Sequence, residues 1–187
     1  MSDLTITHAG STVTQSRPGM GSNSERLNQM IVKVIDVTLT TAVGTHGDNT
    51  VISESIEIPN AVSEKGGSAI IQSIYLQNTD NDVESPALEL IFAAKTTTIA
   101  SGGIGTAITA GDDGMVVAKI QGSTTVSNWS TFKPSSNEFA VKSNIGLVVR
   151  AESDTRSIYV HTINRSGDDF TPSDTGKLTA RIGIVQS

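Results

Sequence analysis

The stretch that decides the fold is GSAIIQSIYLQNTDNDVESPALELIFA, residues 67–93. Two apolar runs in it alternate with a period of two, which is the pattern of half-buried strands. The apolar positions of the first run are Ile70, Ile74 and Leu76, with Gln72 interrupting them. Those of the second run are Leu88, Leu90 and Phe92, with Glu89 pointing the other way. Polar residues 78–86 separate the runs, so the stretch predicts one long β-hairpin.

Strands of the same kind are predicted at residues 31–41, 51–59, 115–120, 147–152, 158–161 and 178–184. In the first of these, the inward positions should be Ile35, Val37 and Leu39. In the last, they should be Leu178, Ala180, Ile182 and Ile184. On the strand over 158–161, His161 alternates outward, away from Ile158 and Val160.

The strand over 51–59 has a mixed pattern. Its inward positions should be Ile52, Ile56 and Ile58, and its water-facing positions Ser53, Ser55 and Glu57. Glu54 shares the inward parity, and a carboxylate there predicts a β-bulge or strand end close by.

No segment keeps a helical period of 3.6 residues, and the short intervals between strands favour antiparallel pairing. The fold class predicted is therefore all-β: an antiparallel β-sandwich, jelly-roll-like, over residues 29–187. Residues 95–111 form a Thr/Ala/Gly-rich connector, and residues 129–139 are expected to be loops anchored by Trp129, Phe132 and Phe139.

Residues 1–28 differ from the sandwich in composition, because Ser, Thr, Gly, Asn and Gln dominate them. We interpret them as an extended polar N-terminal arm with too few large apolar side chains to order by itself. Two interpretations stay open: a disordered tail, or an arm that orders against a neighbouring subunit.

Charge and composition narrow the range of partners. The net charge is −6, with four Lys/Arg against eleven Asp/Glu in residues 1–93 and nine against eight in residues 94–187. This balance predicts no nucleic-acid binding, since no basic stripe is present to release counterions. No basic amphipathic helix or long apolar run predicts membrane binding, and the polar N-terminus does not resemble a signal peptide. The absence of cysteine weakly favours a reducing compartment of synthesis.

The acidic loop from Asn78 to Glu84 places oxygen ligands at alternate positions, as calcium loops do. The EF-hand pattern requires glycine at the sixth position, where this chain has Val83. A solvated hairpin tip is therefore the preferred interpretation, and metal binding by this loop is left open. The acidic pairs at 112–113 and 168–169 adjoin glycines, which is ordinary turn chemistry.

Other candidate motifs are weak. The histidines His8, His46 and His161 lack metal-ligand spacing. The glycine run at 102–105 lacks the Lys-Ser/Thr of a phosphate-binding loop. Asn128 and Asn164 begin glycosylation acceptor patterns that chance explains in a Ser- and Asn-rich chain. No catalytic constellation is visible, so we predict no enzyme, no cofactor, no metal and no catalytic residue.

Four strand motifs carry a resemblance to a known group of proteins. They are the SIYLQNTD run at 73–80, LELIF at 88–92, SIYV at 157–160 and the closing strand at 178–184. The chain from residue 70 to 187 resembles small all-β structural proteins of tailed bacteriophages, the capsid decoration (cement) or minor head proteins. Residues 1–66 lie outside this resemblance.

The resemblance implies a virion protein on the capsid surface, made in the host cytoplasm. It would bind the major capsid protein on the outer surface of the head and stabilise the shell by bridging capsomers. A homo-oligomer is implied, with a trimer favoured. The alternatives are another virion component (tail, collar or baseplate) and a carbohydrate-binding or adhesin module, in which Trp129 with Tyr75 or Tyr159 would stack on sugar rings.

Overall fold

The structure is a computed structural model that describes residues 4–8, 11–15, 31–39, 42–80, 86–109, 120–132 and 137–186. Within these residues it contains eleven β-strands and no helix, so the all-β prediction is confirmed. No helix in the described part of the chain is long and apolar enough to cross a membrane.

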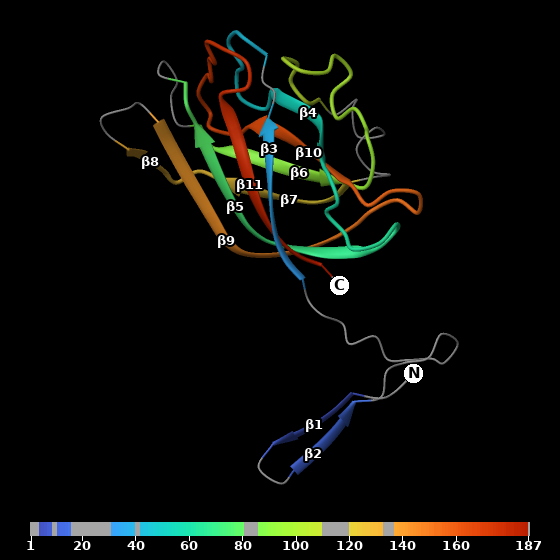
Figure 1. Ribbon diagram of the computed structural model, residues 1–187. Helices are drawn as coiled ribbons and strands as arrows, with labels where there is room; N and C mark the ends of the chain where they lie inside the picture. The colour runs from blue at the N-terminus through green and yellow to red at the C-terminus, as the bar shows by residue number, and fades with distance from the viewer. Residues whose placement is uncertain are drawn as a thin grey trace.

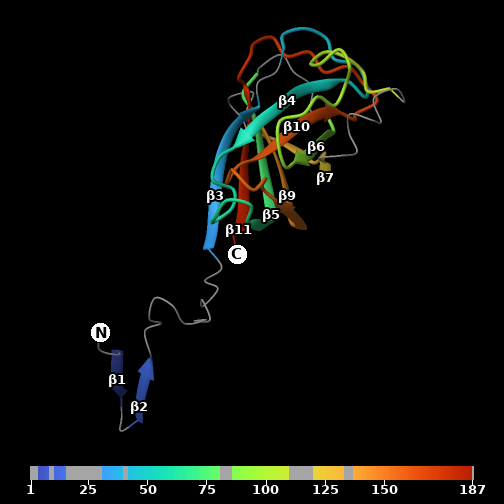
Figure 2. The same cartoon turned by 90° about the vertical axis from the view of Figure 1, so that its right-hand side faces the viewer.

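Two antiparallel sheets pack face to face, as Figures 1 and 2 show from the front and from the edge. The five-stranded sheet has the order β3 (Ile31–Leu39), β11 (Leu178–Gln186), β5 (Ser68–Asn78), β9 (Asn137–Arg150) and β8 (Trp129–Phe132). The four-stranded sheet has the order β4 (Val51–Ile58), β10 (Ile158–Asn164), β6 (Leu88–Ala93) and β7 (Ile120–Val126). The predicted β-sandwich is therefore confirmed.

Strand pairing in the sandwich is nested. β3 pairs with β11, β4 with β10, β5 with β9 and β6 with β7, and each pair is antiparallel. Consecutive strands from β3 to β6 consequently alternate between the two sheets, and so do β9, β10 and β11.

The predicted hairpin over residues 67–93 is wrong. Its two strands exist as β5 and β6, but they lie in different sheets and do not pair with each other. Period-two alternation shows which residues face the core, but both sheets of a sandwich share one core. Two strands that cross the core give the same pattern as two strands of a hairpin.

The predicted inward series of β5 is also wrong at Ile70. Ala69 and Ile71 are buried, whereas Ile70 is only partly buried and lies on the opposite face. In the pairing with β11, Ile71 lies opposite Ile184 and Ser73 opposite Gly183, so Gln72 is an extra residue of β5 and forms a β-bulge. The extra residue reverses the parity, so Ile74 and Leu76 face inward beyond it.

The core between the sheets otherwise follows the predicted alternation. The fully buried predicted positions are Leu39, Ile52, Ile58, Ile74, Leu76, Leu88, Leu90, Phe92, Ile158, Val160, Ile182 and Ile184. Together they form one continuous apolar cluster, to which both sheets contribute.

The bulge predicted near Glu54 is confirmed, but the burial of Ser53 was predicted wrongly. The register of β4 against β10 shifts between Ser53 and Ile56, and Ser55 lies there with a φ of 52°. Ser53 is fully buried instead of facing water.

The loop segment after β6 covers the outer face of the four-stranded sheet. Ile99 and Ala100 are fully buried against Val51, Ile91 and Ile163, forming a second apolar cluster. Figure 2 shows this yellow-green segment beside β6 and β10. The sequence did not predict that the connector would act as a third layer.

The region after the connector differs from prediction. The strand predicted at 115–120 lies almost entirely outside the described residues, and β7 follows it instead. The predicted loops at 129–139 are wrong in part, because β8 and the start of β9 occupy this region.

The predicted arm over residues 1–28 lies largely outside the described residues. Its described parts are β1 (Leu4–His8) and β2 (Ser11–Gln15), which pair with each other and with no other described strand.

Candidate functional site

The outward side of the five-stranded sheet is the candidate site, and we call it the open face. The outer side of the four-stranded sheet is covered by the connector, as described above. No described segment forms a comparable apolar cluster over the five-stranded sheet, and Figure 1 views this sheet directly.

Four apolar residues cross the open face in register, and we call them the apolar row. Val32 of β3 pairs with Val185 of β11, which pairs with Ile70 of β5, which pairs with Val148 of β9. Val32 is 74% exposed and Val148 is 61% exposed. Because contiguous exposed apolar surface is unfavourable in water, such a row indicates a contact site for another molecule.

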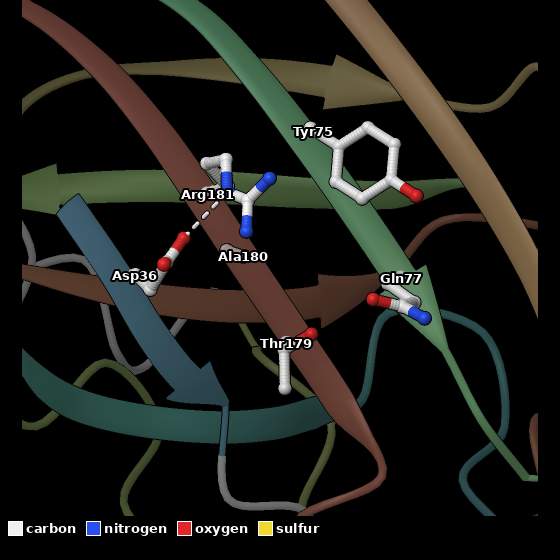
Figure 3. A pocket seen from close by; sticks show the side chains of 6 residues that line it. All are labelled: Asp36, Tyr75, Gln77, Thr179, Ala180 and Arg181. Atoms are coloured by element: carbon white, nitrogen blue, oxygen red, sulfur yellow. Dashed lines mark hydrogen bonds and ion pairs between the residues drawn. The ribbon is translucent and has the colours of Figure 1, made fainter. Parts of the chain in front are cut away.

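A polar–aromatic patch lies further along the same strands, and it begins four residues beyond Val32 on β3, at Asp36. It consists of Asp36, Arg181, Tyr75, Gln77 and Phe139. Four of these residues, with Thr179 and Ala180, line a shallow pocket of about 160 Å³ (Figure 3).

An exposed ion pair holds one side of this patch in place. Nε of Arg181 donates to Oδ1 of Asp36 at 2.7 Å, and both side chains are more than half exposed. The hydrogen bond and the charge of Asp36 raise the pKa of Arg181 above its usual value. Arg181 is therefore a fixed cation on the open face, with further donor groups available to a partner.

An aromatic pair forms the other side of the patch. Tyr75 and Phe139, from neighbouring strands, lie with ring centroids 5.9 Å apart and planes 15° apart. In Figure 3, the Tyr75 ring and the Arg181 side chain lie on the same side of the sheet. Arginine and aromatic residues are enriched where proteins contact each other.

The acidic loop is not a simple solvated tip at its beginning. Asp80 is only 5% exposed, and its carboxylate accepts hydrogen bonds from the Ser173 amide (2.7 Å), the Ser173 hydroxyl (2.6 Å) and the Asp174 amide (3.4 Å). Asn78 is also buried, and its Oδ1 accepts from the Asp80 amide. These contacts fix this end of the loop; Asp82 and Glu84 lie outside the described residues.

The structure does not bring the three histidines together. His8 is in β1, His46 is in the loop before β4, and His161 is in β10. Nε2 of His46 lies 2.8 Å from the Ala42 carbonyl. Among the described residues, no group of three His, Cys, Asp or Glu side chains could hold a metal ion.

The outward parity predicted for His161 is correct, but its exposure was misjudged. The connector covers that side of the sheet, and His161 is fully buried. Its Nδ1 accepts a hydrogen bond of 3.1 Å from the Ser55 amide. Burial lowers the pKa of His161 to about 4.

The glycine run and one glycosylation pattern have internal roles. The amides of Gly103 and Gly105 donate to the carbonyls of Ala100 (2.9 Å) and Val51 (2.8 Å). Asn164 is fully buried and donates to three backbone carbonyls in the neighbouring loops. The acidic pair at 112–113 lies outside the described residues, and Asp168 accepts from Asn164 through its carbonyl.

Trp129 does not form a platform with Tyr75. Its indole Nε1 donates to the Pro86 carbonyl at 2.6 Å, and its ring packs against the core. Tyr75 lies on the open face instead, and Tyr159 belongs to the other sheet.

Sequence reasoning did not select the open face as a site. The available signal was the apolar character of both parities at the start of β3, where Val32 and Val34 adjoin the inward series. Val32 pairs with Val185, and the same row of the sheet reaches Val148 two strands beyond β11. This row can be recognised only from the order of the strands, which the sequence pattern does not provide.

Comparison with known proteins adds no assignment: the chain matches no protein-family model, no curated protein and no solved structure.

Proposed function

We propose that the protein is a structural virion component, a decoration protein that binds the outer surface of a tailed-phage head. The observation that carries the proposal is the open face, where exposed valines and the polar–aromatic patch share one broad β-surface. A rigid sheet that combines apolar residues, an arginine and two aromatic rings has the composition of a protein-binding surface.

The strand order supports the same proposal by analogy. We interpret the nested pairing of β3 with β11, β4 with β10, β5 with β9 and β6 with β7 as a jelly roll. Jelly rolls recur in viral capsid proteins, although a fold alone does not define a function.

The mechanism would be cross-linking of the shell. A homo-oligomer, with a trimer favoured, presents several open faces at once, so that each added contact raises the retention of the whole assembly. Contacts to the major capsid protein at several capsomers then stabilise the shell where subunits meet.

The test is co-sedimentation with phage heads that lack the protein. Saturable binding is expected, and Arg181→Glu in the polar–aromatic patch should weaken it. Arg156→Glu makes the same charge change in an exposed turn outside the open face and should bind normally. Absence of saturable binding to the heads would overturn the proposal, and equal binding of both variants would remove the patch from it.

Carbohydrate binding is the second candidate, because the rings of Tyr75 and Phe139 are nearly parallel beside the polar Gln77. Aromatic faces of this kind suit sugar rings. A glycan array without hits for the wild-type protein would exclude it, whereas hits lost in Tyr75→Ala would favour it over decoration.

A further inference from the structure

We infer that the connector is a pH-sensitive strap: protonation of His161 releases residues 95–103 from the outer side of the four-stranded sheet while the sandwich stays folded. This strap belongs to the sandwich itself and is independent of the proposed binding to a phage head.

The connector is fastened to the bulge of β4 by two neighbouring side chains. The hydroxyl of Ser55 donates to the Thr97 carbonyl at 2.7 Å and accepts from the Thr97 amide at 3.0 Å. Oε1 of Glu54 accepts from the Ile99 amide at 2.8 Å. We call these four residues the clasp. Because its bonds depend on two adjacent side chains, a small movement of the bulge breaks them together.

His161 is joined to the clasp through Ser55. The Ser55 amide donates to Nδ1 of His161 at 3.1 Å, so this one residue contacts both the buried ring and the connector. Ser55 also has a φ of 52°, a left-handed conformation that is unfavourable for a residue with a Cβ. Backbone strain of this kind persists only while surrounding contacts enforce it, and it recurs at switch regions.

A second proton on the His161 ring has no acceptor in the closed arrangement. Nε2 is buried without a partner among the described residues. Nδ1, once protonated, would point a donor at the donor N–H of Ser55. Burial accordingly lowers the pKa of His161 to about 4. The imidazolium is stable only when water reaches the ring, which requires the covering connector to move away.

The titratable and charged groups around His161 do not supply a counter-charge. On the adjacent strands, the connector and the flanking turns they are Glu54, Glu57, Glu89, Lys95, Glu152, Tyr159 and Arg165. None of them is a hydrogen-bond partner of Nε2. The carboxylates of β4 and β6 accept instead from the Ile99 amide, the Ser157 hydroxyl and the Arg165 guanidinium, and Glu152 pairs with Lys95.

Solvent already reaches the clasp from outside. Glu54, Ser55 and the three threonines at 96–98 line an open surface pocket of about 310 Å³. Opening of the strap needs only to extend this pocket toward the ring. Segments held by a few solvent-accessible hydrogen bonds open locally at a lower free energy than the whole domain.

The far end of the connector provides a hinge. The Gly105 amide donates to the Val51 carbonyl at 2.8 Å, and the Val51 amide donates to the Thr106 carbonyl at 3.0 Å, so this end is tied to β4 independently of the bulge. Gly103 and Gly105 have φ values of 69° and 84°, which glycine adopts without strain. Residues 95–103 can therefore lift between this tie and the end of β6 (Figure 2).

Amide hydrogen exchange followed by NMR tests the strap in the full-length wild-type protein. Rates are measured at pH 7 and pH 5, and each is divided by the intrinsic rate at its pH. The amides of Thr97 and Ile99 donate into the clasp, so their protection reports its opening. The slowest amides of β5 and β11 report global unfolding.

The clasp amides should be less protected than the slowest amides of β5 and β11 at both pH values. Their protection should fall by about twentyfold from pH 7 to pH 5, because the open state binds the proton with a pKa of 6.5 and the closed state with a pKa of about 4.

Two variants identify the titrating group. His161→Asn keeps an oxygen that can accept from Ser55 but does not titrate, so its clasp protection should change by less than about threefold over the same range. Glu54→Gln keeps an acceptor for the Ile99 amide and removes the carboxylate of the clasp, so it should retain the wild-type change.

The wild-type measurement alone can overturn the inference. Clasp amides as protected as the slowest amides of β5 and β11 at pH 5 would show that the connector leaves only by global unfolding. Equal protection at the two pH values would show that opening is not coupled to a proton. A full change in His161→Asn, or its loss in Glu54→Gln, would assign the coupling to another group and would overturn the inference as well. Heads are absent from this experiment, so its failure leaves the decoration proposal untouched.

Discussion

The backbone amide of Ser55 donates a hydrogen bond to Nδ1 of His161 across the bulge of β4, at 3.1 Å. Because Nδ1 accepts, the neutral ring carries its proton on Nε2, which is buried and has no partner among the described residues. The bond joins the bulge to β10 beneath the connector.

This arrangement predicts a loss of stability in acid. Burial lowers the pKa of folded His161 from 6.5 to about 4, so the unfolded chain binds the proton first as the pH falls. The free energy of unfolding should therefore decrease between pH 6.5 and pH 4, by a total on the order of 3 kcal/mol. Urea denaturation at intervals across this range measures the effect.

The matched control is His161→Asn, whose amide oxygen can still accept from Ser55 but does not titrate. Its unfolding free energy should depend less on pH in this window, while the carboxylates contribute equally to both proteins. Identical pH slopes for the wild type and the variant would contradict the role given to His161.

Asp80 is predicted to hold the loop after β5 against residues 173–174. Asp80→Ala leaves the Ser173 amide and hydroxyl without their acceptor, so it should lower the unfolding free energy by about 2–3 kcal/mol. Asp154→Ala, in an exposed turn, should change it by less than about 0.5 kcal/mol. Thermal melting of the two variants measures the difference. Equal midpoints would show that the Asp80 contacts do not stabilise the loop after β5.

A charge placed in the core should lower the free energy of unfolding much more than a charge placed on the open face. Ile74→Asp and Leu90→Asp bury a carboxylate between the sheets and should destabilise by several kcal/mol, about enough to unfold a marginal domain. Thr38→Asp, exposed on the open face, should change stability by less than about 1 kcal/mol. Similar denaturation midpoints for all three would mean that the facing of the strands is incorrect.

Deletion of residues 1–28 should separate folding from assembly. The β1–β2 hairpin pairs with no strand of the sandwich, so the melting temperature of the isolated monomer should hardly change. Dissociation from sister copies or from heads should become faster, since lost contacts act mainly on the off-rate. A large drop in the monomer's melting temperature would place these residues in its core, and unchanged retention on heads would make them a passive tail.

Alternation in the sequence was sufficient to predict the inward residues of β3, β6 and β11, because each keeps one parity throughout. It failed in β5, where the bulge at Gln72 against β11 reverses the parity. A single extra residue has no signature in composition, and its effect emerges only when both neighbouring strands are placed.

Which strands pair with each other could not be predicted from the sequence, for a different reason. β5 and β6 both face one shared core, and the link between them is equally suited to a hairpin or a crossing between sheets. Because the strand order could not be predicted, the open face could not be predicted either. Its apolar row consists of Val32, Val185, Ile70 and Val148, which are seen to be neighbours only when the order of four strands is known. The burial of His161 likewise depends on a connector without regular structure.

The most direct test of the central claim is a cryo-electron microscopy reconstruction of phage heads after addition of the purified protein. The account predicts two-layered β-sandwich density on the outer shell, with the five-stranded sheet turned toward a capsid subunit or a sister copy. Density confined to the tail, an undecorated shell, or a sandwich whose five-stranded sheet faces solvent would contradict it.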